Sequence, residues 1–154
     1  MENVIEALSY ERDIIQLKLL NVPKHPKMIA RMFTIIKEED INIDMISQVT
    51  VDHHVQIEIT LDQDYQLKLN NAILKLKDEF KQLEIYQIRK YSKIAVGGQL
   101  VETTPGLAAK VFETLGNANI HFYQITTIKR TIYCVIDKDN LDMAIQVLKE
   151  QFNI

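Results

Sequence analysis

Few residues of this chain have the types and spacing that catalysis requires. The one cysteine, Cys134, alternates with Ile132 and Ile136 in a strand-like pattern. A lone cysteine in such a pattern is most often a small buried apolar residue. A nucleophilic thiol would need a basic neighbour that lowers its pKa, and the sequence suggests none. The chain also lacks the GxxxxGK[ST] and GxGxxG loops that bind phosphates. We therefore expect no catalytic residues in this chain.

The histidines do not form a recognisable metal site. They are His25, His53, His54 and His121, and the adjacent pair falls in an expected hairpin turn. Metal ligation by adjacent residues needs two more ligands that the sequence does not place. The pair Gly97-Gly98 falls at a strand end, where glycine usually lets the chain turn. We expect neither a metal nor another cofactor.

Composition narrows the class of protein. The chain has 154 residues, 47% of them hydrophobic and 25% charged, with a net charge of −3 and one cysteine. The charge does not favour binding to nucleic acid or to an anionic membrane. No apolar run approaches the ~18 residues that span a membrane, and the N-terminus does not resemble a signal peptide. These features predict a soluble cytoplasmic protein of one domain or two small ones.

The elements that position any functional residue come from a stretch that occurs twice. Residues 26–48, PKMIARMFTIIKEEDINIDMISQ, align without a gap with residues 105–127, PGLAAKVFETLGNANIHFYQITT. Each copy is a helix pattern followed by a strand pattern, and a constant shift of 79 residues matches their apolar positions. A repeat of this size predicts two copies of one supersecondary unit.

The rest of the chain extends each copy into the same order of elements. In the first half we expect strands at 14–20, 41–51, 54–60 and 84–89, with helices at 26–39 and from 62–64 onward. In the second half we expect strands near 94–96, 119–128 and 131–137, with helices that begin at Thr104-Pro105 and at Asp139 or Asn140. The order β-α-β-β-α-β is that of a ferredoxin-like unit. The predicted fold class is α+β, with two antiparallel sheets that carry helices on one face.

The second half lacks a closing strand, whereas the first has one strand too many at its front. We infer that residues 3–9 form the missing strand. The first domain would then span 13–90, inserted into a second domain of 91–154 that is completed by strand 3–9.

The helix starts of such units suggest binding rather than catalysis. A helix N-terminus presents free N–H groups and partial positive charge, which favour a carboxylate. Asn42, Asp44 and Gln48 on the following strand are candidate acceptors for an ammonium group. Together these groups would suit an amino acid. The alternative is that Asn42 and Asp44 simply begin a strand.

At these residues the chain resembles a known family. NVPKHPKMIARMF followed by INIDMISQ is similar to the first ACT domain of the aspartokinase regulatory region. VETTPGLAAKVFETL, with the terminal AIQVLKEQF, is similar to the second ACT domain, and the opening ENVIEALSYERDIIQLKLLNVP matches the entry to that region. Nothing corresponds to the amino-acid kinase domain, and the chain begins about where separately made β subunits begin. The resemblance implies a regulatory part of an aspartate kinase without a catalytic domain.

The resemblance also implies a function and a site. Tandem ACT domains of this family bind lysine, threonine or both as feedback inhibitors of aspartate-family biosynthesis, at interfaces between first and second ACT domains that usually cross a homodimer. Partners would be the amino-acid effector, a second copy and an aspartokinase catalytic chain. The carried-over positions are Lys24, Met28, Ile29, Asn42, Asp44 and Gln48 in the first domain, and Thr104, Gly106, Leu107, Ala108, His121, Phe122 and Thr127 in the second.

Four positions depart from the family pattern. Lys24 stands where an aspartate is usual and Lys27 where a glycine is usual, while His121 replaces an asparagine and Ile128 a small polar residue. A lysine at 24 would repel the ammonium group that the aspartate holds. Two alternatives stay open: a degenerate ACT pair that serves only as a dimerisation module, and a free-standing amino-acid sensor with an unrelated partner.

Overall fold

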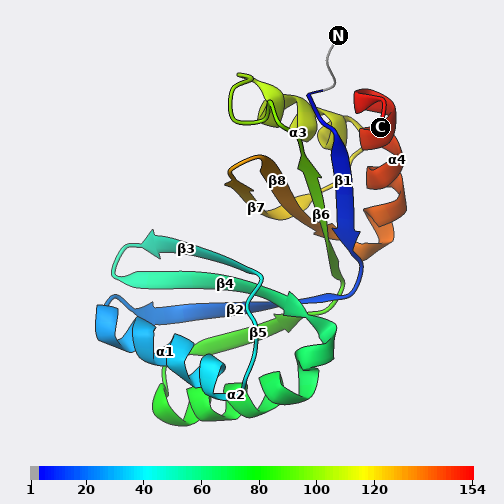
Figure 1. Cartoon of the computed structure of the whole chain (residues 1–154). Coiled ribbons are helices and arrows are strands. Elements are labelled where there is room, and N and C mark those ends of the chain that lie inside the picture. Colours follow the sequence, from blue (N-terminus) through cyan, green and yellow to red (C-terminus); the bar gives the residue numbers. More distant parts are fainter. Residues whose placement is uncertain (1–3) are drawn as a thin grey trace. The chain divides into compact units, whose positions relative to one another are not determined.

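The computed structural model of the protein describes residues 4–154, which form two compact units (Figure 1). Unit 1 comprises the segment up to Asp13 and the segment Lys90–Ile154, and unit 2 comprises Ile14–Arg89. Each unit is a four-stranded antiparallel sheet with two α-helices. The predicted α+β class, with two ferredoxin-like sheets, is therefore confirmed.

Unit 2 has the predicted order of elements. They are β2 (Ile14–Pro23), α1 (Pro26–Glu38), β3 (Met45–Val51), β4 (His54–Asp62), α2 (Gln66–Glu79) and β5 (Glu84–Ile88), with a short 3-10 turn at Gln63–Tyr65 before α2. The spatial order of the strands is β3-β4-β2-β5. The long strand β2 is therefore central, and β3 and β5 are the edges.

The core of unit 2 lies between one face of this sheet and the two helices. The predicted stripe of α2 is buried at Leu69, Ala72, Ile73 and Leu76. On α1 the fully buried residues are Met32, Ile35 and Ile36, whereas Ile29 and Phe33 are only partly buried. Burial of each large aliphatic side chain contributes about 1.5–3 kcal/mol, so these stripes fix the helices on the sheet.

Ion pairs also connect the helices of unit 2. The guanidinium of Arg31 donates to both carboxylate oxygens of Glu79, at 2.9 Å from Nε to Oε2 and 2.6 Å from Nη2 to Oε1. This hydrogen bonding is the main cause that lowers the pKa of Glu79 below its usual value. Both side chains are more than 40% exposed, so the pair is a small contributor to stability.

Unit 1 repeats this architecture with a strand from the start of the chain. Its elements are β1 (Ala7–Glu11), β6 (Tyr91–Gly97), α3 (Leu107–Asn117), β7 (Phe122–Ile128), β8 (Thr131–Asp137) and α4 (Leu141–Phe152), with a 3-10 turn at Lys138–Asn140 before α4. The strand order is β1-β6-β8-β7. β1 pairs antiparallel with β6, from Ala7 opposite Gly97 to Glu11 opposite Lys93, which Figure 1 shows as the dark blue strand beside the green one.

Several predicted boundaries were wrong. The first strand lies at Ala7–Glu11 instead of 3–9, and residue 3 is outside the described residues. α3 begins at Leu107 and not at Thr104-Pro105, because Gly106 adopts a left-handed φ of +80° and reverses the chain there. The side chain of Asn140 makes no cap hydrogen bond, since a 3-10 turn leads into α4.

The strands that follow the first helix of each unit also start later than predicted. β3 begins at Met45 and β7 at Phe122, not at 41 and 119. Asp40 and Asn119 have φ values of +57° and +56°, and each helix therefore ends in a left-handed turn. Ile41 and Ile120 come next and are buried before their strands begin. Their apolar character reflects core packing rather than pairing in a sheet.

Candidate functional site

The start of α1 carries three of the expected site residues, Lys24, Met28 and Ile29. Lys24 is exposed in the turn after β2, and Met28 is 42% exposed. His25 is the N-cap, and its Nδ1 accepts a hydrogen bond from the Lys27 backbone N–H at 3.2 Å. Pro26 has no N–H, and the amides of Met28 and Ile29 both donate to the His25 carbonyl at 3.1 Å. The first turn of α1 thus has its donors already bonded.

The capping role of His25 was not predicted from sequence. Proline at the first helical position nevertheless indicates that the preceding residue is the cap. The consequence is chemical. A carboxylate at this helix start would compete with the ring of His25 for the Lys27 amide.

The start of α3 differs in this respect. Gly106 precedes the helix and its carbonyl accepts from the Lys110 amide at 3.0 Å, but no side chain caps the helix. Among residues 4–154, no acceptor is bonded to the backbone N–H groups of Leu107, Ala108 and Ala109. Thr104 lies in the preceding turn, where its amide donates to the Leu100 carbonyl at 3.0 Å. Three adjacent unbonded amides at a helix N-terminus form a suitable site for an anion.

The polar residues expected to contact an ammonium group lie at and before the edge strand β3. Asn42 and Asp44 are exposed and precede the strand, and Gln48 is exposed within it, opposite Ile57 of β4. The Asp44 amide donates to the Thr60 carbonyl at 2.9 Å, and the Thr60 hydroxyl lies 3.5 Å from Oδ2 of Asp44. Asp44 is therefore held against β4, with its side chain at the surface.

The corresponding residues of unit 1 lie on β7, the other edge strand. His121 is exposed just before the strand, and Thr127 is exposed within it, opposite Ile132. Phe122 is half-buried and its ring lies 5.4 Å from that of Phe112 on α3. Phe122 is thus part of the packing between β7 and α3. Ile128, at the end of β7, is 54% exposed.

The structure therefore distributes the expected residues over one helix start and one edge strand in each unit. In unit 2 these are the start of α1 and the segment around β3, and in unit 1 the start of α3 and β7. The two units are unequal, because the first amides of α1 are bonded whereas those of α3 have no partner among residues 4–154.

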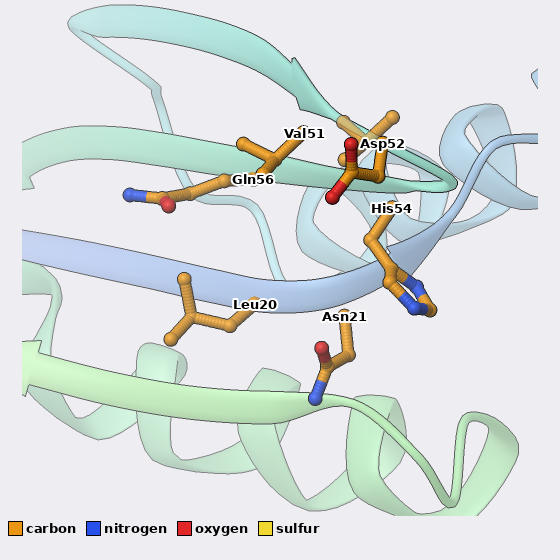
Figure 2. A pocket seen from close by; sticks show the side chains of 7 residues that line it. Leu20, Asn21, Val51, Asp52, His54 and Gln56 are labelled. Carbon is orange, nitrogen blue, oxygen red and sulfur yellow. The ribbon is translucent and has the colours of Figure 1, made fainter.

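Two further hollows lie at the hairpins that end the edge strands. In unit 2 a hollow of ≈ 280 Å³ is lined by Leu20, Asn21, Val51, Asp52, His54, Val55 and Gln56 (Figure 2). In unit 1 a hollow of ≈ 560 Å³ is lined by Glu102, Ile128, Lys129, Arg130, Thr131 and Tyr133. Neither hollow was predicted. The feature that the two hairpins share is the first turn residue, Asp52 or Lys129, which has a positive φ in the structure.

Groups suited to catalysis or metal binding are scarce in the described part of the chain. Between residues 4 and 154, no three His, Cys, Asp or Glu side chains are grouped to hold a metal ion. Cys134 is buried in the core of unit 1, and its burial raises the thiol pKa to about 12. Within the same residues, no helix is both long and apolar enough to cross a membrane.

Comparison with protein families matches residues 94–152 to the ACT domain. The aspartate kinase of Pseudomonas putida is 23% identical over 152 residues, which are 98% of this chain and 37% of that protein. The chain thus spans little more than a third of the length of the curated relatives that it matches.

Solved structures match this chain along nearly its whole length. The ligand-free regulatory subunit of the Thermus thermophilus aspartate kinase superposes with a TM-score of 0.86 at 21% identity, covering 97% of this chain and 99% of that one. A structure of aspartokinase alpha and beta subunits gives the same TM-score and coverage at 22% identity. In sequence and in fold, this chain is similar along nearly its whole length to the ACT-domain regulatory region of aspartokinases.

Proposed function

We propose that this chain is a regulatory protein that binds a free amino acid and acts in the cytoplasm as the regulatory part of an aspartate kinase. Its role would be feedback control of lysine, threonine or methionine biosynthesis. The observation that carries this proposal is the start of α3, where Gly106 is followed by three unbonded amides. The full-length similarity to a separate regulatory subunit supports it.

In the proposed site, the effector carboxylate binds the amides of Leu107 and Ala108. Asp44 and Gln48, supplied by a second copy of the chain, accept hydrogen bonds from the effector ammonium group. Ammonium is a donor-only group, so a carboxylate and an amide oxygen are appropriate partners. Thr104, His121 and Thr127 are the further polar positions of this site.

Exposed apolar residues on the edge strands support an assembly of two copies. On β3, Ile46, Val49 and Val51 are each more than half exposed, and on β7 Ile125 is 40% and Ile128 54% exposed. An exposed apolar edge strand is a ready template for pairing with another chain. A kinase catalytic chain is the second proposed partner, because the similar beta subunits were solved together with alpha subunits.

One observation favours the alternative of a dimerisation module without an effector. Lys24 and Lys27 flank the start of α1, and that helix start already has its amides bonded. A free amino acid would meet two cations and few free donors there. A free-standing sensor with an unrelated partner is the third candidate, and pull-down of the partner distinguishes it from the first.

Calorimetric titration with lysine, threonine, methionine and the other amino acids tests the proposal. We expect saturable binding of at least one of them. Gly106→Val should abolish it, because a β-branched residue resists the φ of +80° that this turn requires. A stable dimer that binds no amino acid would favour the dimerisation module.

Lys24→Asp tests whether the first loop belongs to the site. The change replaces a repulsive charge with an attractive one, so we expect a zwitterionic effector to bind severalfold more tightly. Lys81→Asp, which makes the same charge change in the exposed turn after α2, is the matched control and should leave the affinity unchanged. An equal affinity for Lys24→Asp and the parent chain would place Lys24 outside the site.

A further inference from the structure

The hollow in unit 2 exists because the ladder between β2 and β4 is interrupted. Leu19 pairs with Ile57 and Val22 with Val55, so Leu20 and Asn21 together oppose Gln56 alone. This is the arrangement of a β-bulge, and Asn21 has a left-handed φ of +57°. The bulge and the neighbouring turn at Asp52 enclose a space of ≈ 280 Å³ whose apolar lining is Leu20, Val51 and Val55. This size suits a ligand of a few heavy atoms.

The amide groups that line the hollow have fixed orientations. Nδ2 of Asn21 donates to Glu84 Oε1 at 3.1 Å, and Nε2 of Gln56 donates to Glu58 Oε1 at 3.2 Å. Ionised carboxylates only accept hydrogen bonds, so the NH₂ end of each amide must face its glutamate. Their oxygens are therefore the ends left for a ligand. Figure 2 shows the Asn21 oxygen on the side of Asp52 and His54, with its nitrogen turned away.

Asp52 adds a charged acceptor to the same rim. Its φ of +54° places it at the first position of the β3–β4 turn, and Figure 2 shows its carboxylate directed back over the strands rather than away from the hollow. Within the described residues, this carboxylate has no hydrogen-bond donor or ion-pair partner. No lysine or arginine lines the hollow.

We propose that this hollow binds a small primary ammonium ion with a short aliphatic body. An ammonium group has three N–H donors and no acceptor. Asp52 and Asn21 Oδ1 supply two acceptors, and Leu20 and Val51 contact the aliphatic part. This site shares no residue with the proposed effector site and does not depend on it.

The hollow of unit 1 provides an internal comparison. It lies at the corresponding β7–β8 hairpin, but Lys129 and Arg130 replace the turn residues Asp52 and His53. Arg130 is bonded to Gln99 at 2.8 Å and lies 3.8 Å from Glu102, whereas Lys129 has no ion-pair partner among residues 4–154. An ammonium ion would be repelled there, so binding should be confined to the hairpin of unit 2.

The test is a titration of the full chain, methyl-labelled at leucine and valine, with isopentylammonium chloride, followed by NMR. We expect saturable shifts of the Leu20 and Val51 methyl resonances. Isopentanol should bind at least about tenfold more weakly, and 3-methylbutanoate should not bind, because each lacks the charge that Asp52 attracts.

Asp52→Asn should weaken binding of the amine about tenfold, and asparagine tolerates the left-handed backbone at this turn. Asp40→Asn is the matched control, since Asp40 has the same φ sign and the same charge but lies at the end of α1. The proposal is overturned if the amine gives no saturable shift at these methyls, if isopentanol binds equally well, or if Asp52→Asn and Asp40→Asn bind alike.

Discussion

Cys134 illustrates how its neighbours decide the chemistry of a single residue. Its side chain is 1% exposed on β8, and burial raises its thiol pKa to about 12. We expect the native protein at pH 8 to resist iodoacetamide, because the reactive thiolate is scarce and enclosed. The same protein in urea should be alkylated readily. Mass spectrometry of the treated protein measures both results, and rapid labelling of the folded chain would contradict the burial.

The same pKa shift predicts a dependence of stability on pH. In the unfolded chain the thiol titrates near 9, whereas in the folded chain it stays protonated to about 12. Between these values the folded state binds more protons than the unfolded state, so stability is present below pH 9 and falls as the pH rises. Cys134→Ala should remove this part of the slope, which urea unfolding at pH 8 and pH 10 would reveal.

The effector-binding role of single residues in the candidate site stays a prediction. The residue types at 24, 27, 121 and 128 were readable from the sequence, as was their departure from the family pattern. The capping of α1 by His25 was not, because a histidine ring rarely caps a helix and the bond depends on its rotamer. The orientation of Asn21 depends on Glu84 of β5, far away in the sequence, whereas that of Gln56 depends on Glu58, two residues along the same strand.

Among the elements, the junction of β1 with β6 depends on a glycine. A Cβ at Gly98 would lie 2.1 Å from the carbonyl oxygen of Val4, so a side chain there must displace the segment before β1. We expect Gly98→Ala to lower the free energy of unfolding of unit 1 by about 1–3 kcal/mol, the usual cost of overpacking. Hydrogen exchange of the β1 amides should accelerate with it.

Gly116→Ala is the matched control. Gly116 lies in α3, and a Cβ there meets no atom within 4 Å. The change should leave stability unchanged or raise it by up to about 1 kcal/mol, because alanine favours the helix. If Gly98→Ala and Gly116→Ala were equally stable, the close contact with the Val4 carbonyl would not be the reason for glycine at position 98.

The order and type of the elements were predictable, because the spacing of apolar residues indicates which face of each helix or strand packs against the core. The helix stripe at Leu69, Ala72, Ile73 and Leu76 and the hairpin at 52–53 followed from it directly. Boundaries that depend on backbone conformation were not predictable in this way. A left-handed Gly106 moved the start of α3, and left-handed turns at Asp40 and Asn119 delayed the strands that follow.

For the whole molecule, we propose that the units are separate domains and that unit 2 is inserted into unit 1. Several contacts tie the first segment to unit 1. Ile5 is fully buried in its core, Arg12 Nη2 lies 2.8 Å from Asp142, and Asp13 pairs with Lys138 at 3.0 Å. The Ser92 hydroxyl donates to the Arg12 carbonyl at 2.6 Å.

Deletion of residues 1–11 tests this organisation. It removes β1 and Ile5, so we expect amide protection to be lost throughout β6, β8 and α4. Protection in β2, β4 and α2 should stay at the level of the full chain. Hydrogen exchange measured by mass spectrometry separates the two sets, and an equal loss of protection in both would show that the units unfold together.

The pairing of β1 with β6 has a consequence for synthesis on the ribosome. The strand that is translated first, Ala7–Glu11, pairs with Tyr91–Gly97, so it must wait while the whole of unit 2 is made. Domains generally fold as units during translation. The inserted unit would therefore fold first. Because Gln16 lies opposite Ile88 in its sheet, this folding would bring Asp13 and Lys90 together at one end of that sheet before the second sheet closes.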